Sequence, residues 1–346
     1  MLVIDVQAIG VVLSKRRTRK NKFIDVLTKL CFNTGNRTPH TSDSSVQSGD
    51  VFFRGVSMKY NRCATTVERQ VEILKERGLQ VKDTDFAVKA IREIGYFRFK
   101  GYCLPYYQSK DKFKNDVSFE LIYENYRFDE RFRLLLFQII EHVEVELKSV
   151  ISGDFALETS ALGFYNHENF ENKEYHKLWL DNFEKLISQS AKRRELYTEH
   201  YLTKYEKTFP VWVATEISDF GSLSKFFSNI KTPLKNKISK SNYGVASVYL
   251  TNWIHLLSVV RNICAHNGRI YDRILPIQAR LTSKERKNNI ANNRVFVAIL
   301  ICKKLCLNED YFSMFAKNLQ HLIQLYDKSI SIDRIGFPEN WKYYLC

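Results

Sequence analysis

A broad apolar stripe at helical spacing runs through residues 119–151 and constrains the fold more than any other feature of the sequence. The stripe consists of Tyr123, Tyr126, Phe128, Phe132, Leu135, Leu136, Ile139, Ile140, Val143, Leu147 and Val150. Apolar residues that recur every three or four positions occupy one face of an α-helix. Unbroken, this helix would extend about 45 Å at about 1.5 Å per residue. The pattern therefore predicts one long helix.

Amphipathic helical patterns also cover most of the chain from residue 65 onward. Thr66, Glu68 and Gly78 bound one helix, and Asp83 caps a second at residues 86–94. Pro210 opens a third, whose predicted core face includes Trp212. Further helices are predicted at residues 283–307 and 310–327, after a basic connection at 231–245. Six prolines and 13 glycines, against 24 phenylalanines and 19 tyrosines, favour long helices over a turn-rich β fold.

The sequence therefore predicts an all-α protein with two helical parts. A small N-terminal helical subdomain is expected at residues 58–115 and a helical bundle at residues 116–346. Residues 1–57 differ in composition, with a basic cluster at 15–20 and a polar tract at 33–50. They are predicted to be a disordered basic extension. The compositional break also favours Met58 as the native start, which would leave this segment untranslated.

The balance of charge bounds the class of partner. The formal net charge is +15 and the isoelectric point is near 9.3, which indicates an anionic partner, nucleic acid first and an acidic membrane surface second. No run of about 18 apolar residues is present, so no membrane span is expected. Seven cysteines without paired spacing indicate neither a disulfide framework nor a zinc ribbon. We therefore expect a cytoplasmic protein.

Acidic residues are dense on the polar side of the long helix: Asp129, Glu130, Glu141, Glu144 and Glu146, with His142 among them. Only residues three or four apart share a helical face, which leaves the pairs Glu141–Glu144 and His142–Glu146. Two pairs on different faces favour a solvated face over a metal site. The sequence thus predicts no metal and no cofactor.

A second helix, at residues 253–266, brings chemistry-bearing side chains together at its end. Its apolar residues recur at helical spacing, and Asn267-Gly268 supplies a left-handed residue that ends a helix. Asn262 and His266 share one face, and Arg261 lies about one residue's rotation to the side. The alternative is that Arg261 and His266 are there because cations are favoured at a helix C-terminus.

The string Arg261-Asn262-x-x-x-His266 resembles the Arg-Asn-x-x-x-His signature of HEPN-superfamily ribonucleases. The longer run through Arg273 resembles, more narrowly, bacterial abortive-infection proteins of the AbiD/AbiF-like type. Two other stretches resemble blocks of the same family: residues 91–102, with Gly95 in place of a polar residue, and residues 210–224, with Asp219 in place of a serine. The resemblance implies an all-α, HEPN-like helical bundle and a phage-defence role.

The resemblance also implies a mechanism that side-chain chemistry supports. RNA carries its own nucleophile, the 2′-hydroxyl, so cleavage needs proton transfer and charge stabilisation rather than a metal. His266 suits proton transfer near neutral pH, Arg261 offers planar donors to the phosphate, and Asn262 can orient either group. Expected products are a 2′,3′-cyclic phosphate and a 5′-hydroxyl. Because HEPN nucleases pair two motifs across a two-fold axis, the resemblance also implies a homodimer.

Basic and aromatic side chains outside this trio are candidates for RNA binding. They are Arg98, Lys192, Arg193, Arg194, Lys204, Arg269, Tyr271 and Arg273. For each of them, packing or a solvated basic face is the alternative. Two other functions stay open: a non-catalytic module that binds a small RNA or an antitoxin RNA or protein, and a HEPN partner of a nucleotidyltransferase.

Overall fold

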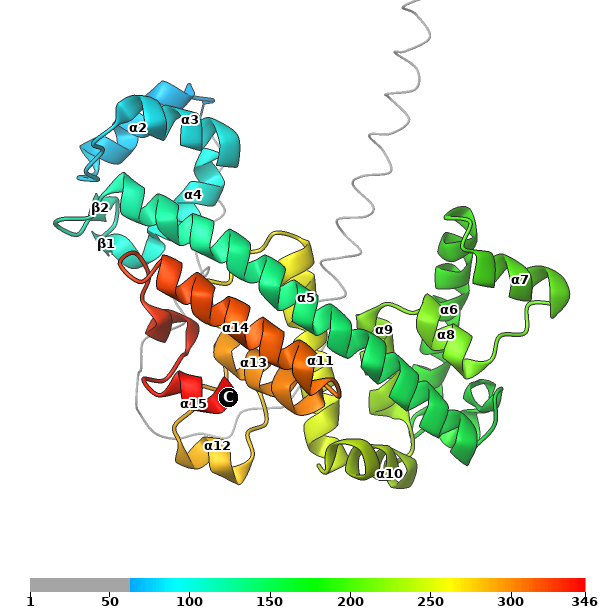
Figure 1. Cartoon of the computed structure of the whole chain (residues 1–346). Coiled ribbons are helices and arrows are strands. Elements are labelled where there is room, and N and C mark those ends of the chain that lie inside the picture. The colour runs from blue at the N-terminus through cyan, green and yellow to red at the C-terminus, as the bar shows by residue number, and fades with distance from the viewer. Residues whose placement is uncertain (1–62, 346) are drawn as a thin grey trace, which may run out of the picture. The chain divides into compact units, whose positions relative to one another are not determined.

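The computed structural model describes residues 63–345, which form one compact helical unit (Figure 1). The expected extension at 1–57 and the Met58 start lie outside the described residues. Apart from a short antiparallel hairpin, β1 (Tyr107–Ser109) with β2 (Lys112–Phe113), the described part consists of helices and loops. Tyr107 pairs with Phe113 in the hairpin, and Ser109 with Lys112. The prediction of an all-α fold is confirmed.

Between residue 63 and the hairpin lie three short α-helices: α2 (Val67–Glu76), α3 (Thr84–Ile94) and α4 (Tyr96–Cys103). The side chains of Thr66 and Asp83 accept hydrogen bonds from backbone N–H groups in the first turns of α2 and α3, as their N-cap positions predict. Gly78 and Gly95 adopt positive φ angles of 89° and 84° at the ends of these helices.

Helix α5 (Phe119–Glu158) spans 40 residues and is the axis of the fold (Figure 1). It extends seven residues past the predicted end and reaches about 60 Å at about 1.5 Å per residue. It packs against helices from both ends of the chain, including α4, α8, α11, α13 and α14. The predicted boundary at residue 116 falls in the loop between β2 and α5.

The remaining elements follow α5 in the order η2 (Gly163–Tyr165), η3 (His167–Asn169), α6 (Lys173–Lys192), α7 (Leu196–Lys204), α8 (Val211–Ile217), α9 (Phe220–Asn229), α10 (Thr232–Tyr243), α11 (Ser247–Ala265), α12 (Ser283–Lys287), α13 (Val295–Leu305), α14 (Glu309–Leu325), η4 (Ile332–Ile335) and α15 (Trp341–Leu345). The short helix η1 (Leu104–Tyr106) lies before the hairpin.

Among the described helices none is individually long and apolar enough to cross a membrane, although α10 and α11, bent by 78°, meet that criterion as a pair.

Two predicted helices are interrupted and one predicted loop is helical. The helix opened by Pro210 ends at Ile217, and Asp219 caps a new helix, α9, by accepting a 2.7 Å hydrogen bond from the N–H of Ser222. Trp212, predicted to face the core, is half exposed. The predicted helix at 283–307 is split into α12 and α13, and the basic connection at 231–245 contains α10. Strong local capping therefore overrode the apolar periodicity at Asp219.

A buried carboxylate joins α4, α5 and the loop that follows α11. Asp129 of α5 is fully buried and accepts hydrogen bonds from the hydroxyl of Tyr102 and from Arg133. It also accepts 3.1 Å and 2.7 Å bonds from the N–H groups of Ile270 and Tyr271. The prediction that Asp129 lies on a solvated face was wrong, because the donors that satisfy it come from segments distant in sequence.

We expect Asp129→Ala to lower the free energy of unfolding by about 3–5 kcal/mol, since it leaves the buried Arg133 unpaired. Urea unfolding followed by circular dichroism measures the change. Glu141→Ala, at an exposed position on the same helix, is the control and should stay within about 0.5 kcal/mol of wild type. Equal stabilities of the two variants would contradict the assigned role of Asp129.

Candidate active site

Helix α11 ends at the residues that the sequence singled out. His266 is the C-cap, and Asn267 adopts the left-handed conformation with φ 55°. The N–H of Gly268 then donates a 2.7 Å hydrogen bond back to the carbonyl of Ile263, and that of Asn267 donates to Cys264 at 3.1 Å. These two bonds form a Schellman motif. A Cβ at Gly268 would lie 2.9 Å from Cγ2 of Ile263, so the close return of the chain requires glycine.

The last turns of α11 change from core to surface. Val260 and Cys264 are buried, whereas Asn262 and His266 are exposed on the opposite side of the helix. Arg261 lies between, with 29% of its side chain exposed. The side chain of His266 makes no hydrogen bond or ion pair within residues 63–345. The structure thus presents an amide and an imidazole to solvent on the face that the spacing predicts.

Arg261 is held by three neighbours. Its Nη1 donates to Oδ1 of Asn262 at 3.2 Å, and its Nε lies 3.4 Å from Oε2 of Glu144. The guanidinium also lies 5.9 Å from the ring centroid of Phe137, a cation–π distance. Both Glu144 and Phe137 belong to α5. The long helix therefore fixes the orientation of the arginine on α11.

Glu144 is a buried carboxylate with two cationic neighbours. Its side chain is 7% exposed, and its Oε1 lies 3.3 Å from Nζ of Lys148. Burial raises the pKa of Glu144 above its ordinary value, and Lys148 and Arg261 offset only part of that rise. The prediction that Glu144 lies on a solvated face was wrong. No periodicity could have shown its role, because its partner Arg261 lies 117 positions further along the chain.

A cavity of about 260 Å³ opens beside this ion pair. Glu144, Lys148, Arg261 and Arg193 line it together with Ser218 and Asp219 of the α8–α9 junction and with Glu195 and Glu216. Four of these charged groups are acidic and three are basic. The cavity is therefore mixed in charge.

Arg98, predicted to bind RNA, lies at the same end of α11. Its Nη1 donates a 2.7 Å hydrogen bond to the carbonyl of Asn267, directly after the left-handed turn. The neighbouring Phe97 is 91% exposed. This hydrogen bond joins residues 169 positions apart. It brings the aromatic stretch around Arg98 to the end of the Arg261–His266 stretch.

A family model described as Abi-like protein matches residues 89–272, more than half of the chain. The chain belongs to this family of abortive infection proteins. The matched span begins within α3 and ends at Asp272, so it includes Arg98, Glu144, Arg193 and the whole Arg261–His266 stretch. No curated protein and no solved structure matches the chain.

The residues that follow Gly268 make structural contacts. Tyr271 is 1% exposed, and its hydroxyl accepts a 3.0 Å hydrogen bond from the N–H of Ser331. Asp272 forms ion pairs with Arg294 and Arg334 at 3.2 Å and 3.6 Å. Tyr271, predicted to contact RNA, therefore lies in the core and is not available at the surface.

Arg269 and Arg273 are half-buried and bound to the backbone. Nη1 of Arg269 donates to the carbonyl of Tyr271 at 2.7 Å, and Nη1 of Arg273 donates to the carbonyl of Arg269 at 3.2 Å. Burial, with repulsion from Arg269, lowers the pKa of Arg273. Both guanidinium groups therefore contact the loop after α11, and their predicted contact with RNA stays a prediction.

The predicted basic surface at 192–204 divides into two places. Arg193, the C-cap of α6, lines the cavity beside Arg261, with Lys192 and Arg194 exposed on either side of it in the chain. Lys204 lies at the end of α7, where its Nζ is 5.6 Å from the ring centroid of Tyr205. Only Arg193 is thus placed beside the residues of the α11 end.

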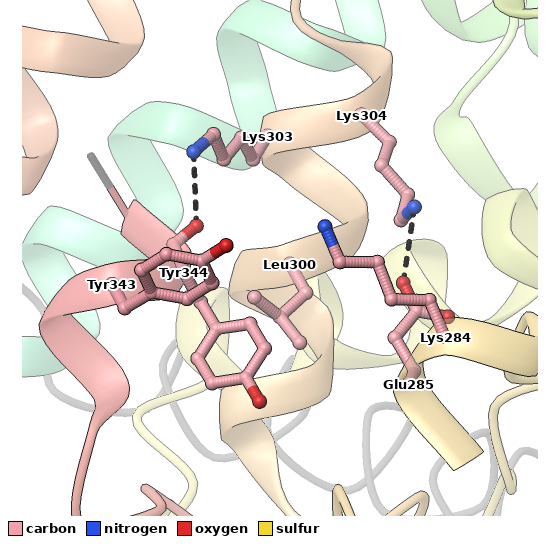
Figure 2. Close-up of a pocket in the computed structure, with 7 residues that line it drawn as sticks. All are labelled: Lys284, Glu285, Leu300, Lys303, Lys304, Tyr343 and Tyr344. Carbon is pink, nitrogen blue, oxygen red and sulfur yellow. Dashed lines mark hydrogen bonds and ion pairs between the residues drawn. The ribbon is translucent and has the colours of Figure 1, made fainter. Parts of the chain in front are cut away.

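A larger pocket, about 430 Å³, lies apart from the α11 end and shares no lining residue with the cavity at Arg261 (Figure 2). Residues of α12, α13 and α15 line it: Lys284, Glu285, Leu300, Lys303, Lys304, Tyr343 and Tyr344. Two of its lysines have partners there, Lys304 with Glu285 and Lys303 with the carbonyl of Tyr344, both at 3.0 Å. It contains none of the predicted site residues.

The raised pKa of Glu144 predicts a pH dependence. Protonation of Glu144 is favoured in the folded chain, so its contribution is fully present below its ordinary value near 4.5 and is lost as the pH rises through the raised value. Glu144→Gln mimics the protonated acid. We therefore expect the unfolding free energy of wild type, relative to that of Glu144→Gln, to fall as the pH rises above the ordinary value near 4.5. Urea titrations over a series of pH values measure it, and parallel pH profiles would contradict the prediction.

Proposed function

We propose that this member of the Abi-like family is a metal-independent endoribonuclease of the HEPN type that acts in phage defence in the cytoplasm. The observation that carries the proposal is the exposed face at the end of α11. There Asn262 and His266 face solvent beside Arg261, whose orientation is set by Glu144 and Phe137. Most of the surrounding polar side chains are engaged in structural contacts, whereas His266 is left accessible at the centre of the site.

The proposed reaction uses the nucleophile that RNA supplies. His266 transfers a proton at the 2′-hydroxyl or at the leaving 5′-oxygen, a role for which imidazole suits neutral pH. Arg261 donates to the non-bridging oxygens as negative charge develops on the phosphorus centre. Asn262, bonded to Arg261, restricts the arginine's rotamers and turns its own amide toward the scissile phosphate. Cleavage leaves a 2′,3′-cyclic phosphate and a 5′-hydroxyl.

The fixed arginine supports catalysis over simple charge attraction. Contacts to Asn262, Glu144 and Phe137 restrict the guanidinium before any ligand arrives, which lowers the entropy lost when a phosphate binds. Glu144 reduces the net charge at Arg261, so non-specific attraction for RNA is weaker there than at an unpaired arginine. A non-catalytic RNA-binding module, the second candidate, would also gain affinity from the restrained guanidinium, but it would have no use for the exposed imidazole of His266.

We further propose that two copies pair with the ends of their α11 helices facing each other, so that two Arg-x4-His motifs form one composite site. Exposed apolar side chains flank this end: Phe97 at 91% and Leu134 at 68% exposed. Phe97 precedes Arg98, which binds Asn267, and Leu134 lies one turn of α5 from Phe137, which contacts Arg261. Burying both residues in a two-fold interface would remove this apolar surface from water.

The first test is cleavage of total RNA by the full chain in EDTA. We expect His266→Ala and Arg261→Ala each to lower the cleavage rate by at least about 100-fold, the lower range for loss of a general acid–base group and of a donor to developing negative charge. Cyclic-phosphate ends on the products identify the chemistry. His255→Ala is the matched control, because His255 is an exposed histidine on the same helix, three turns earlier.

Two other outcomes would decide against the ribonuclease. If wild type and both variants are equally inert yet bind RNA equally well, the chain is a binding module for RNA. If the variants cut as fast as wild type, the nuclease activity belongs elsewhere in the chain or to a contaminant. Folding of each variant is checked by its urea midpoint.

The second test addresses the dimer. Leu134→Glu places a charge on the proposed interface, and we expect it to shift the mass in light scattering from dimer to monomer and to abolish cleavage. Leu157→Glu is the control: this leucine is 84% exposed on the same helix but about 35 Å away along its axis. A wild-type chain that is monomeric at assay concentration while cleaving RNA would overturn the composite site.

A further inference from the structure

Three metal-ligating side chains meet on the side of α5 turned toward α13 and α14. They are His142 and Glu146, one turn apart on α5, and Cys306, the C-cap of α13. Their ligand atoms, an imidazole nitrogen, a carboxylate oxygen and a thiol sulfur, all lie within 4.8 Å of one another. Nε2 of His142 is 3.2 Å from Oε1 of Glu146. The sequence offered only the His142–Glu146 pair, and the fold adds the third group.

Neighbouring groups orient two of the three side chains, His142 and Glu146. The ring of His142 stacks on Tyr311 of α14 with centroids 3.8 Å apart and an interplanar angle of 11°. The other oxygen of Glu146, Oε2, accepts a 2.9 Å hydrogen bond from the N–H of Leu307, which leaves Oε1 directed at the histidine. Such supporting contacts are typical of residues that bind a metal.

The histidine nitrogen is an unusual atom in its own right. Nε2 of His142 is buried and completes no hydrogen bond within the described residues, although Glu146 lies close to it. Buried polar atoms nearly always have a partner, and one without a partner needs an explanation. A cation bound between His142 and Glu146 would provide it.

We propose that His142, Glu146 and Cys306 bind a zinc ion that ties α5 to the α13–α14 connection. Nitrogen, oxygen and sulfur ligands together match Zn²⁺, whereas Mg²⁺ and Ca²⁺ prefer oxygen alone. Bond lengths of about 2.0–2.3 Å require ligand atoms about 3.3–3.8 Å apart in a tetrahedron, which small rotamer changes reach from the present spacing. An open hollow beside Glu146, lined also by Glu309 and Asp310, gives the ion an acidic entry path and room for a water as fourth ligand.

This site is distinct from the proposed nuclease site. At about 100° per residue, His142 and Glu146 project from α5 on a different side from Glu144, which faces Arg261. The zinc ion would therefore not contact the Arg261 site, and the proposal does not depend on ribonuclease activity.

The test is titration of the metal-free full chain with Zn²⁺ against a chromophoric chelator, and with Co²⁺ as a spectroscopic probe. We expect one tight equivalent and, for Co²⁺, a thiolate-to-metal charge-transfer band with the visible spectrum of a tetrahedral site. Three near-isosteric variants remove one ligand each: Cys306→Ser, Glu146→Gln, which keeps an oxygen for Leu307, and His142→Phe, which keeps the ring stack. Each should weaken zinc binding by at least about 100-fold, since loss of even a supporting group costs about 10–100-fold.

Controls separate this site from the other cysteines of the chain. Cys63→Ser, at an exposed position, should leave the affinity and the charge-transfer band unchanged. Zinc should raise the melting temperature of wild type and of Cys63→Ser but not that of the three ligand variants. Zinc binding that is equally tight in all variants, or a charge-transfer band that persists in Cys306→Ser, would overturn the proposal.

Discussion

The carboxylate of Asp129 is buried between segments that lie far apart in the sequence, and the position of the candidate site depends on it. It binds Tyr102 of α4, Arg133 of α5 and two backbone N–H groups just after α11. A buried carboxylate is tolerated only when donors replace its lost water, so these partners must be in place together. The chain leaving α11 is thereby anchored to α5 within a few residues of His266. Loss of this anchor would let the helix end move relative to Glu144.

This anchor separates the run from Arg261 to Arg273 into two parts with different contacts. From Gly268 onward its residues form a tight return, a buried tyrosine, an ion-paired aspartate and two arginines bound to backbone carbonyls. These contacts hold the loop, and none of them leaves a side chain free to act on a substrate. Before Gly268 the motif points Asn262 and His266 to solvent. Most charged side chains of this strongly basic stretch are therefore engaged within the protein, and net charge alone overstates the surface free to bind a partner.

Helical periodicity and capping residues predicted the all-α class, the long helix and the end of α11, because these depend on local sequence. The breaks at Asp219 and within residues 283–307 were missed, because one helix can end and the next begin while the apolar residues keep a helical spacing. The roles of Asp129, Glu144 and Cys306 could not be predicted, because each depends on a partner more than a hundred positions away. Whether an acidic residue on a helix is solvated or buried depends on the segment packed against it, which helical spacing does not show. Arg98 was singled out for RNA binding, which stays a prediction; the contact that the structure shows is a hydrogen bond to the protein's own backbone at Asn267.

Helix α5 connects the two sites argued from this structure. One side presents Glu144 and Phe137 to Arg261, and another presents His142 and Glu146 to Cys306, within a stretch of ten residues. A rigid helix cannot move at one of these sides without moving at the other. An ion bound by α5 and α13 would restrict the same turns that orient the arginine, and its removal would loosen them. Metal content could therefore alter the precision of the Arg261 site even though no step of the proposed cleavage requires a metal.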